Sequence, residues 1–168
     1  PLGGDELCYI QFSSGSTRHP HGVQITQRAL MANLSGMVGP AGLDVVEGDR
    51  AISWLPLYHD MGLICAWLSC LVYAIPFVVM SPLRFLAAPQ RWLQAIHDYR
   101  GTLSGAPNFA YELCLRRVPE ELLSKLDLSG WRVAFNGAEP VNPGTMERFA
   151  ARFVACGLDP KALAPVYG

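Results

Sequence analysis

The chain has 168 residues, of which 51% are hydrophobic and 16% carry a charged side chain. This balance is typical of a folded, core-rich protein and excludes an intrinsically disordered chain. The formal net charge is −1 and the lysines and arginines are scattered, so there is no clustered basic stripe and no nucleic-acid partner is expected.

The cysteines bear on the cellular location of the protein, and the chain ends bear on whether the sequence is a piece of a longer one. The cysteines are odd in number and lack zinc or redox spacing: Cys8, Cys65, Cys70, Cys114 and Cys156. They indicate reduced thiols in a cytoplasmic protein, and no secretory signal precedes them. Because the chain opens on Pro1 and stops at Gly168, we expect it to be a piece of a longer protein.

Segments typical of strands alternate with segments typical of helices. Strands are predicted at residues 7–12, 50–55, 75–80, 102–106, 131–135 and 162–166. Helices are predicted from the Thr26 cap to 38, at 61–73, 89–99, 108–117 and 120–125, and from the Asn142 cap to Gly157. The alternation predicts an α/β fold, a mainly parallel sheet of five to six strands with helices on both faces.

Residues 61–82 carry no charged side chain and are long enough to span a bilayer. Pro76 separates a helical pattern from the β-rich stretch 77–80. We therefore expect a buried helix followed by a buried parallel strand, and no membrane span.

Ligands of parallel α/β sheets bind outside the carboxyl ends of the strands. The polar loops of this chain fall at those predicted ends, at residues 13–17, 56–60, 81–83, 105–108 and 136–139. The first of them, Ser13-Ser-Gly-Ser-Thr17, offers hydroxyls and backbone amides of the kind that surround phosphate oxygens. It lacks the Gly-Lys-Ser/Thr of a Walker A loop, and an ordinary surface turn has a similar composition.

Five blocks, in order, give the chain a specific resemblance. They are Gln11–Thr17 with Pro20-His21-Gly22-Val23, Trp54–Leu63, Ala106–Cys114, Leu126–Val141 and Tyr167-Gly168. Together they resemble the adenylate-forming superfamily of acyl-CoA synthetases, luciferases and peptide-synthetase adenylation domains. Within that superfamily, the sequences of these blocks most resemble those of the fatty acyl-AMP ligases.

The resemblance implies that ATP is a substrate. A fatty acid carboxylate attacks its α-phosphate, giving acyl-AMP and pyrophosphate, and the acyl group then passes to the phosphopantetheine arm of an acyl carrier protein. The residues implied for the phosphates of ATP are Ser13, Ser14, Gly15, Ser16, Thr17, His21 and Gly22. His21 stands where the family usually has Lys, and it is alternatively an exposed loop histidine.

Within Pro56-Leu-Tyr-His-Asp-Met-Gly62 the resemblance makes His59 the catalytic residue, placed to stabilise the adenylate through an imidazole N–H. A histidine that satisfies a backbone carbonyl near a turn is the alternative. Asp60 is expected to cap the following helix or to orient His59.

For the adenine and ribose the resemblance implies Asn136, Gly137, Ala138, Glu139, Tyr167 and Gly168. Tyr167 would pack on the base, and Gly137 would let the backbone approach it. Glu139 is alternatively a surface acid that caps a helix. The candidates for the acyl pocket, which also suit a plain core, are Trp54, Met61, Ala106, Pro107 and Asn108.

Two parts of the family's machinery are expected outside these residues. The metal-binding Glu for Mg²⁺ should follow Gly168, so no metal ligand is assigned, and the C-terminal lid with its catalytic Lys is absent. Residues 1–168 would then be one AMP-binding subdomain that lacks the flanking N-terminal sheet and is inactive alone. A fatty acyl-CoA ligase and a non-catalytic nucleotide- or lipid-binding module stay open, while Tyr58-His59-Asp60 disfavours an amino-acid adenylation domain.

Overall fold

The structure is a computed structural model that describes residues 3–13 and 19–167. The chain divides into two compact units, residues 1–45 and residues 46–168.

The first unit pairs a hairpin with a helix. Strand β1 (Leu7–Phe12) runs antiparallel to β2 (Gly22–Thr26), and Phe12 lies opposite Gly22. Helix α1 (Gln27–Val38) begins where the Thr26 hydroxyl accepts a hydrogen bond from the Ala29 N–H, as the cap prediction required. The assignment of residues 7–12 to the parallel sheet was wrong, because the partner strand β2 follows them directly and was not predicted.

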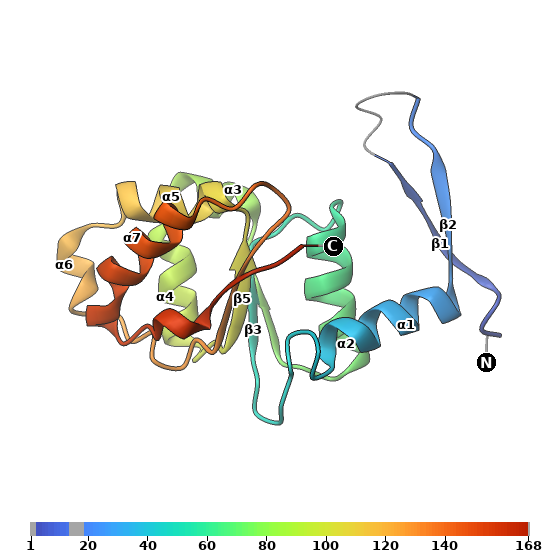
Figure 1. Ribbon diagram of the computed structural model, residues 1–168, viewed down its shortest axis with the longest axis horizontal. Helices are drawn as coiled ribbons and strands as arrows, with labels where there is room; N and C mark the ends of the chain where they lie inside the picture. The colour runs from blue at the N-terminus through green and yellow to red at the C-terminus, as the bar shows by residue number, and fades with distance from the viewer. Residues whose placement is uncertain (1–2, 14–18, 168) are drawn as a thin grey trace. The chain divides into compact units, whose positions relative to one another are not determined.

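The second unit contains a five-stranded parallel sheet, which confirms the predicted fold class (Figure 1). Its spatial order is β4-β3-β5-β6-β7, and every pairing is parallel. The strands are β3 (Ala51–Ser53), β4 (Phe77–Val79), β5 (Leu103–Ala106), β6 (Val133–Asn136) and β7 (Leu163–Pro165). All five carboxyl ends therefore meet at one edge of the sheet.

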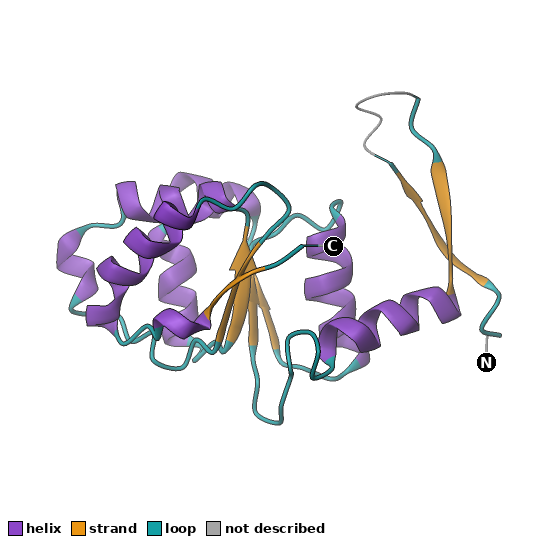
Figure 2. Cartoon of the chain, viewed as in Figure 1, coloured by secondary structure: helices purple, strands orange, loops and turns teal. Residues whose placement is uncertain are grey.

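Helices cover both faces of this sheet (Figure 2). The π-helix η1 (Met61–Leu68) and α2 (Ser69–Val72) lie on one side, while α4, α5 and α7 lie on the other. The remaining bounds are α3 (Pro82–Ala87), α4 (Gln90–Asp98), α5 (Asn108–Arg117), α6 (Glu120–Leu123) and α7 (Pro143–Phe153), with 3₁₀ turns η2 (Val154–Cys156) and η3 (Pro160–Ala162). Helix α3 was predicted as a loop, although the Ser81 hydroxyl accepts from the Leu83 N–H and Pro82 takes its first position.

An aromatic core lies between the sheet and α4, α5 and α7. The rings of Trp92 and Trp131 meet edge to face at 5.3 Å, and both are almost fully buried. The Trp92 indole donates to the Ser104 hydroxyl at 2.8 Å, and that hydroxyl donates to the Ile52 carbonyl at 2.6 Å. One polar chain thus links α4 to the two central strands and leaves the indole N–H satisfied.

An ion pair ties together the amino ends of the central strands. Asp49 precedes β3 and is buried, and its carboxylate lies 2.5 Å from the Arg132 guanidinium and 2.6 Å from the Thr102 hydroxyl. Burial alone would raise the pKa of Asp49, but the hydrogen bonds from Arg132, Thr102 and the Val46 main chain outweigh it and hold that pKa below its ordinary value. The edge opposite the predicted site is therefore fixed by charge.

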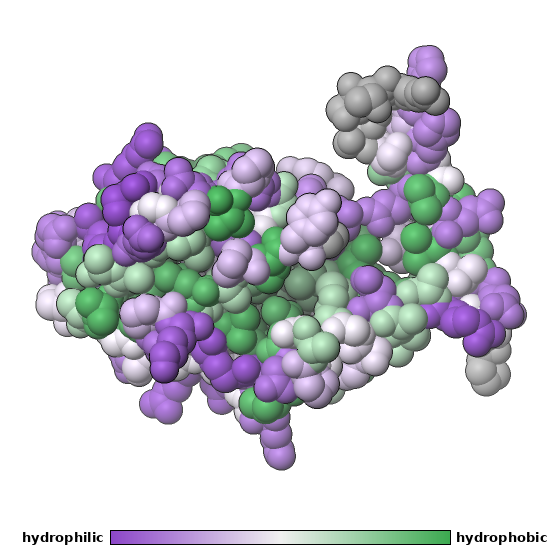
Figure 3. Space-filling model, in the orientation of Figure 1, coloured by the Kyte–Doolittle hydropathy of each residue, from purple (hydrophilic) through white to green (hydrophobic). Residues whose placement is uncertain are grey.

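The surface shows where hydrophilic side chains gather. On the face in Figure 3 they lie over α5 and α7, whose outer positions include Arg116, Glu147 and Arg148. In the part of the chain that the structure describes, no helix has the length and apolar character needed to cross a bilayer. Residues 61–82 instead form η1, α2 and β4, which confirms a helix followed by a parallel strand. The expected burial was wrong for the strand, because β4 lies at the edge of the sheet and is only partly buried.

Candidate functional site

The segments that follow β3, β5, β6 and β7 meet at the carboxyl edge of the parallel sheet. They contain His59, Asn108, the stretch 137–139 and Tyr167, which come from four separate parts of the sequence. The parallel pairing alone brings these predicted site residues to one edge, because each segment leaves the sheet in the same direction.

His59 is half-exposed, in the turn between β3 and η1. Its Nδ1 accepts a hydrogen bond from the Met61 N–H at 3.2 Å, which places the proton of the neutral imidazole on Nε2. Asp60 makes no capping bond to η1, and its carboxylate lies 3.4 Å from the same Nδ1. The expected cap is therefore absent, and the Asp60 carboxylate lies beside the His59 ring instead.

The backbone after His59 follows an unusual course. Eight residues, Met61–Leu68, form a π-helix, a conformation that is rare and frequent at functional sites. A Cβ on Gly62 would stand 2.2 Å from the Pro56 carbonyl oxygen, so only glycine permits this close approach. The sequence motif names Gly62, but its steric reason is visible only in three dimensions.

The residues predicted for the acyl pocket divide between core and surface. Trp54 and Ala106 are buried in the hydrophobic core, where the Trp54 ring stacks on Phe85 at 3.9 Å. The Trp54 indole N–H is buried without a hydrogen-bond partner. Met61, Pro107 and Asn108 are partly exposed. The structure brings Trp54 near the start of α5 through an edge contact with Phe109 at 6.0 Å, and the acyl assignment stays a prediction.

Three asparagines link β6, α5 and α7 beside the sheet edge. The Asn108 side-chain oxygen accepts from the Asn136 amide and from the Asn142 N–H, each at 3.1 Å. The Asn142 side chain caps α7 through the Gly144 and Thr145 N–H groups, as its sequence position predicts. Asn136 is fully buried, and its side-chain oxygen has no partner. In this structure Asn108 and Asn136 therefore act within the protein rather than toward open solvent.

The loop after β6 approaches the end of β7 closely. A Cβ on Gly137 would stand 2.7 Å from a Val166 methyl carbon and 2.9 Å from the Val166 carbonyl oxygen. The close approach that glycine allows here is thus to the neighbouring strand. Ala138 follows with φ +67°, a left-handed conformation that is strained for a residue with a Cβ.

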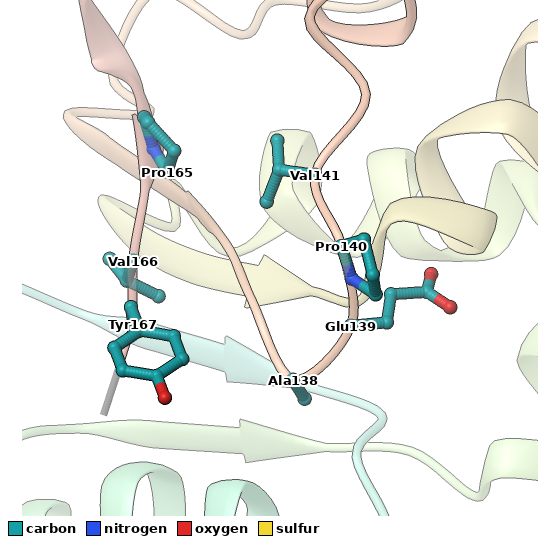
Figure 4. A pocket seen from close by; sticks show the side chains of 7 residues that line it. All are labelled: Ala138, Glu139, Pro140, Val141, Pro165, Val166 and Tyr167. Atoms are coloured by element: carbon teal, nitrogen blue, oxygen red, sulfur yellow. The ribbon is translucent and has the colours of Figure 1, made fainter.

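A hollow of about 620 Å³ opens between this loop and the chain after β7 (Figure 4). Its walls include the predicted residues Ala138, Glu139 and Tyr167. The Tyr167 ring is fully exposed, so its faces are free to stack. Pro140 and Val141 of the sequence block Leu126–Val141 also form the walls, together with Pro165 and Val166, which the sequence interpretation did not assign to the site.

The phosphate-loop prediction falls partly outside the described residues, which omit Ser14, Gly15, Ser16, Thr17 and also Gly168. Ser13 and His21 close the hairpin: the Ser13 N–H donates to the His21 carbonyl, and the His21 N–H donates to the Ser13 hydroxyl at 3.0 Å. Both side chains and Gly22 are exposed.

Across residues 3–13 and 19–167, no cluster of three or more His, Cys, Asp or Glu side chains is arranged to hold a metal ion. The acid that completes such a site was predicted to lie beyond Gly168.

Comparison with known proteins supplies a family. A model described as AMP-binding enzyme matches residues 1–168. The medium-chain-fatty-acid–[acyl-carrier-protein] ligase TtuA of Teredinibacter turnerae is 44% identical over 98% of this chain. A putative fatty-acid–CoA ligase, fadD25 of Mycobacterium tuberculosis, is 39% identical over 99% of it.

A solved structure from a study of fatty acyl-adenylate ligases from E. coli and L. pneumophila matches with a TM-score of 0.94 and 44% identity over 98% of this chain. The chain spans 25% of TtuA, 29% of fadD25 and 30% of the chain in that structure.

Proposed function

Because the chain belongs to the AMP-binding enzyme family, we propose that it is the nucleotide-side part of a ligase that converts a fatty acid and ATP into acyl-AMP and pyrophosphate. The acyl group is then transferred to the phosphopantetheine thiol of an acyl carrier protein. The fatty acid and the carrier protein in this proposal follow from the name of TtuA as a medium-chain-fatty-acid–[acyl-carrier-protein] ligase.

One observation carries the proposal. Residues from four sequence blocks, which the sequence motifs associate with catalysis, acyl binding or nucleotide binding, meet at the carboxyl edge of one parallel sheet. Two of those blocks form the walls of one hollow, with Ala138 on one side and Tyr167 on the other (Figure 4). An open aromatic face beside main-chain groups suits a planar base.

In the first step the carboxylate attacks the α-phosphate, its new C–O–P bond forms, and the bond to the pyrophosphate leaving group breaks. Two anions approach, so charge at the α-phosphate must be stabilised. The His59 Nε2–H supplies a hydrogen-bond donor, since Nδ1 is committed to the Met61 N–H. The hydroxyl of Ser13 and the neighbouring loop would hold the outer phosphates of ATP.

The acceptor distinguishes two versions of this function. The similarity to TtuA supports transfer to a carrier protein, whereas the name of fadD25, a putative fatty-acid–CoA ligase, supports transfer to CoA. The higher identity to TtuA favours the carrier protein. A cytoplasmic location belongs to the same proposal, and the five free cysteines favour it.

The test is an assay of the full-length protein that carries this segment. With ATP and fatty acids of graded length we expect pyrophosphate release and acyl-AMP, followed by acyl transfer to a phosphopantetheinylated carrier protein. CoA in place of the carrier should give little thioester. Efficient acyl-CoA formation would replace the carrier proposal by the CoA version, and no pyrophosphate release with any fatty acid would refute both.

A further inference from the structure

Helix α5 begins without a cap of its own. Its N-cap residue is Pro107, which has no side-chain acceptor, and the first turn contains no acidic residue. The first N–H groups of a helix have no partner within the helix and carry a partial positive charge. The N–H of Phe109 therefore needs an acceptor from elsewhere in the chain.

Glu139 supplies that acceptor from 30 residues away. One of its carboxylate oxygens lies 2.6 Å from the Phe109 nitrogen, a short bond of the charge-assisted kind. In Figure 4 the Glu139 carboxylate points away from Tyr167 and from the space between the two walls. The carboxylate is thus directed at the helix end, while the main chain of Glu139 forms part of the wall.

The same helix end also holds the far end of this loop. The neighbouring residue Asn108 accepts from the Asn142 N–H, and from the Asn136 side chain on the last residue of β6. The loop 137–141 is therefore fixed at its start, middle and end by two consecutive residues of α5. Between the first two anchors lies Ala138, in its strained left-handed conformation. Such a conformation persists only where the surrounding contacts over-determine it.

We propose that Glu139 is a positioning residue: by capping α5 it holds the wall 137–141 in the conformation that receives the nucleotide, and it does not itself contact the base. This inference rests on the proposed function for its ligand. The sequence interpretation placed Glu139 at the adenine site, with a helix-capping acid as the alternative. In the proposal Glu139 is the capping acid, and it supports the wall of the adenine site through that cap.

The kinetic test uses Glu139→Ala, Glu139→Gln and a matched control, Glu147→Ala, in the full-length protein. Glu147 is an exposed acid on α7. Loss of a helix cap is worth about a fivefold change in an equilibrium, so Glu139→Ala should raise the KM for ATP by about that factor with a much smaller change in kcat. Gln retains an acceptor oxygen and should recover most of the affinity, and Glu147→Ala should match the wild type.

Inosine triphosphate separates positioning from direct contact, because it lacks the 6-amino group of ATP. A positioning role predicts the same rise in KM for both nucleotides. A penalty confined to ATP, or an unchanged KM in Glu139→Ala, would overturn the inference.

Amide hydrogen exchange judges the contact without any activity. The Phe109 amide and the peptide covering residues 137–141 should exchange faster in Glu139→Ala than in the wild type or in Glu147→Ala. Unchanged exchange at both places would show that Glu139 does not hold residues 137–141 in place, even in an active enzyme. If Glu139→Ala speeds exchange at both places but the wild type releases no pyrophosphate, the proposed function is refuted instead. The assignment of a nucleotide as the ligand of the wall 137–141 would then fall with it.

Discussion

Two histidines of this chain accept the same kind of main-chain hydrogen bond but lie at different places in the fold. His59 accepts the Met61 N–H through Nδ1 at the carboxyl edge, and His97 accepts the Asp127 N–H through Nδ1 at the end of α4. The sequence favoured His59 only through its motif. The structure adds the tautomer, because the backbone contact leaves Nε2 as the donor.

We expect His59→Ala to slow acyl-AMP formation by about a hundredfold in the full-length protein, the range for loss of one preorganised donor. Because the side chain is half-exposed, its removal should change the free energy of unfolding by only about 0.5 kcal/mol.

His97→Ala is the control for this prediction. It removes an equivalent main-chain contact away from the predicted site and should leave the rate of acyl-AMP formation near that of the wild type. Equal rates for His59→Ala and the wild type in single-turnover measurements would exclude His59 from the mechanism.

At the scale of elements, sequence reasoning found every strand of the parallel sheet and most of the helices, and it missed β2 and α3. The predicted strands of the parallel sheet and the helices α1, α4, α5 and α7 are present, because several apolar positions define each. Strand β2 was missed since its five residues follow a loop and are mostly exposed. A signal was available in the alternation of Val23 and Ile25 with polar residues. Helix α3 had its own signal in Ser81-Pro82.

The π-helix shows what a sequence pattern does not contain. A helix was predicted at residues 61–73, and the apolar run is equally compatible with α or π hydrogen bonding. The Ser69 N–H bonds the Ile64 carbonyl, five residues back, and the Ser69 hydroxyl bonds the same carbonyl at 3.1 Å. The choice between α and π hydrogen bonding depends on how the Gly62 backbone packs against Pro56. The spacing of these two residues in the sequence does not reveal that contact.

Gly62→Ala should therefore destabilise the chain by about 2 kcal/mol, because its new methyl group would overlap the Pro56 carbonyl. Gly36→Ala in α1 is a control of opposite sign. Nothing lies within 4 Å of its added Cβ, so the higher helix propensity of Ala should stabilise by up to about 1 kcal/mol. Calorimetric melting temperatures measure both, and a Gly62→Ala protein as stable as the wild type would contradict the steric explanation.

For the whole molecule, the sequence predicted the fold class and that the candidate site residues after β3, β5, β6 and β7 would share one edge of the sheet. It did not predict the division into two units, because it did not predict the antiparallel pairing of residues 7–12 with 22–26. The predicted phosphate loop therefore belongs to the first unit, and the other predicted site residues belong to the second. Residue patterns report the type of each element, whereas pairing partners depend on contacts that are distant in the chain.

The whole molecule should also respond to acid in a defined direction. The folded-state pKa of Asp49 is lowered, as are those of Glu112, through its bond with Thr145, and Asp127, through Ser129. Such groups contribute stability that is present above their unfolded pKa, about 4, and is lost as pH falls through the lower folded pKa. Urea midpoints should thus be flat from pH 7 to about 5 and fall below about pH 4.

Asp49→Asn tests the origin of this dependence. At pH 7 it should cost about 2 kcal/mol, since the Arg132 charge loses its buried partner but remains partly exposed. At pH 3 its difference from the wild type should shrink. A constant difference at both pH values would show that titration of Asp49 does not contribute.

We expect the 168-residue chain alone to release no pyrophosphate above background from ATP and a fatty acid. It spans only 25–30% of TtuA, fadD25 and the matching solved chain. The full-length protein, assayed in parallel, provides the positive control. Turnover by the isolated chain would show that the missing parts are not needed for the chemistry.

The indole rings of the aromatic core have an optical consequence. All four tryptophans of the chain, at positions 54, 67, 92 and 131, belong to the unit formed by residues 46–168, and the other unit contains none. Intrinsic emission excited at long ultraviolet wavelengths therefore reports on the parallel-sheet unit alone, without any label. Tyr167, beside the hollow, belongs to that same unit but absorbs only at shorter ultraviolet wavelengths, so a nucleotide that stacks on the phenol ring would alter this signal only if an indole moved with it.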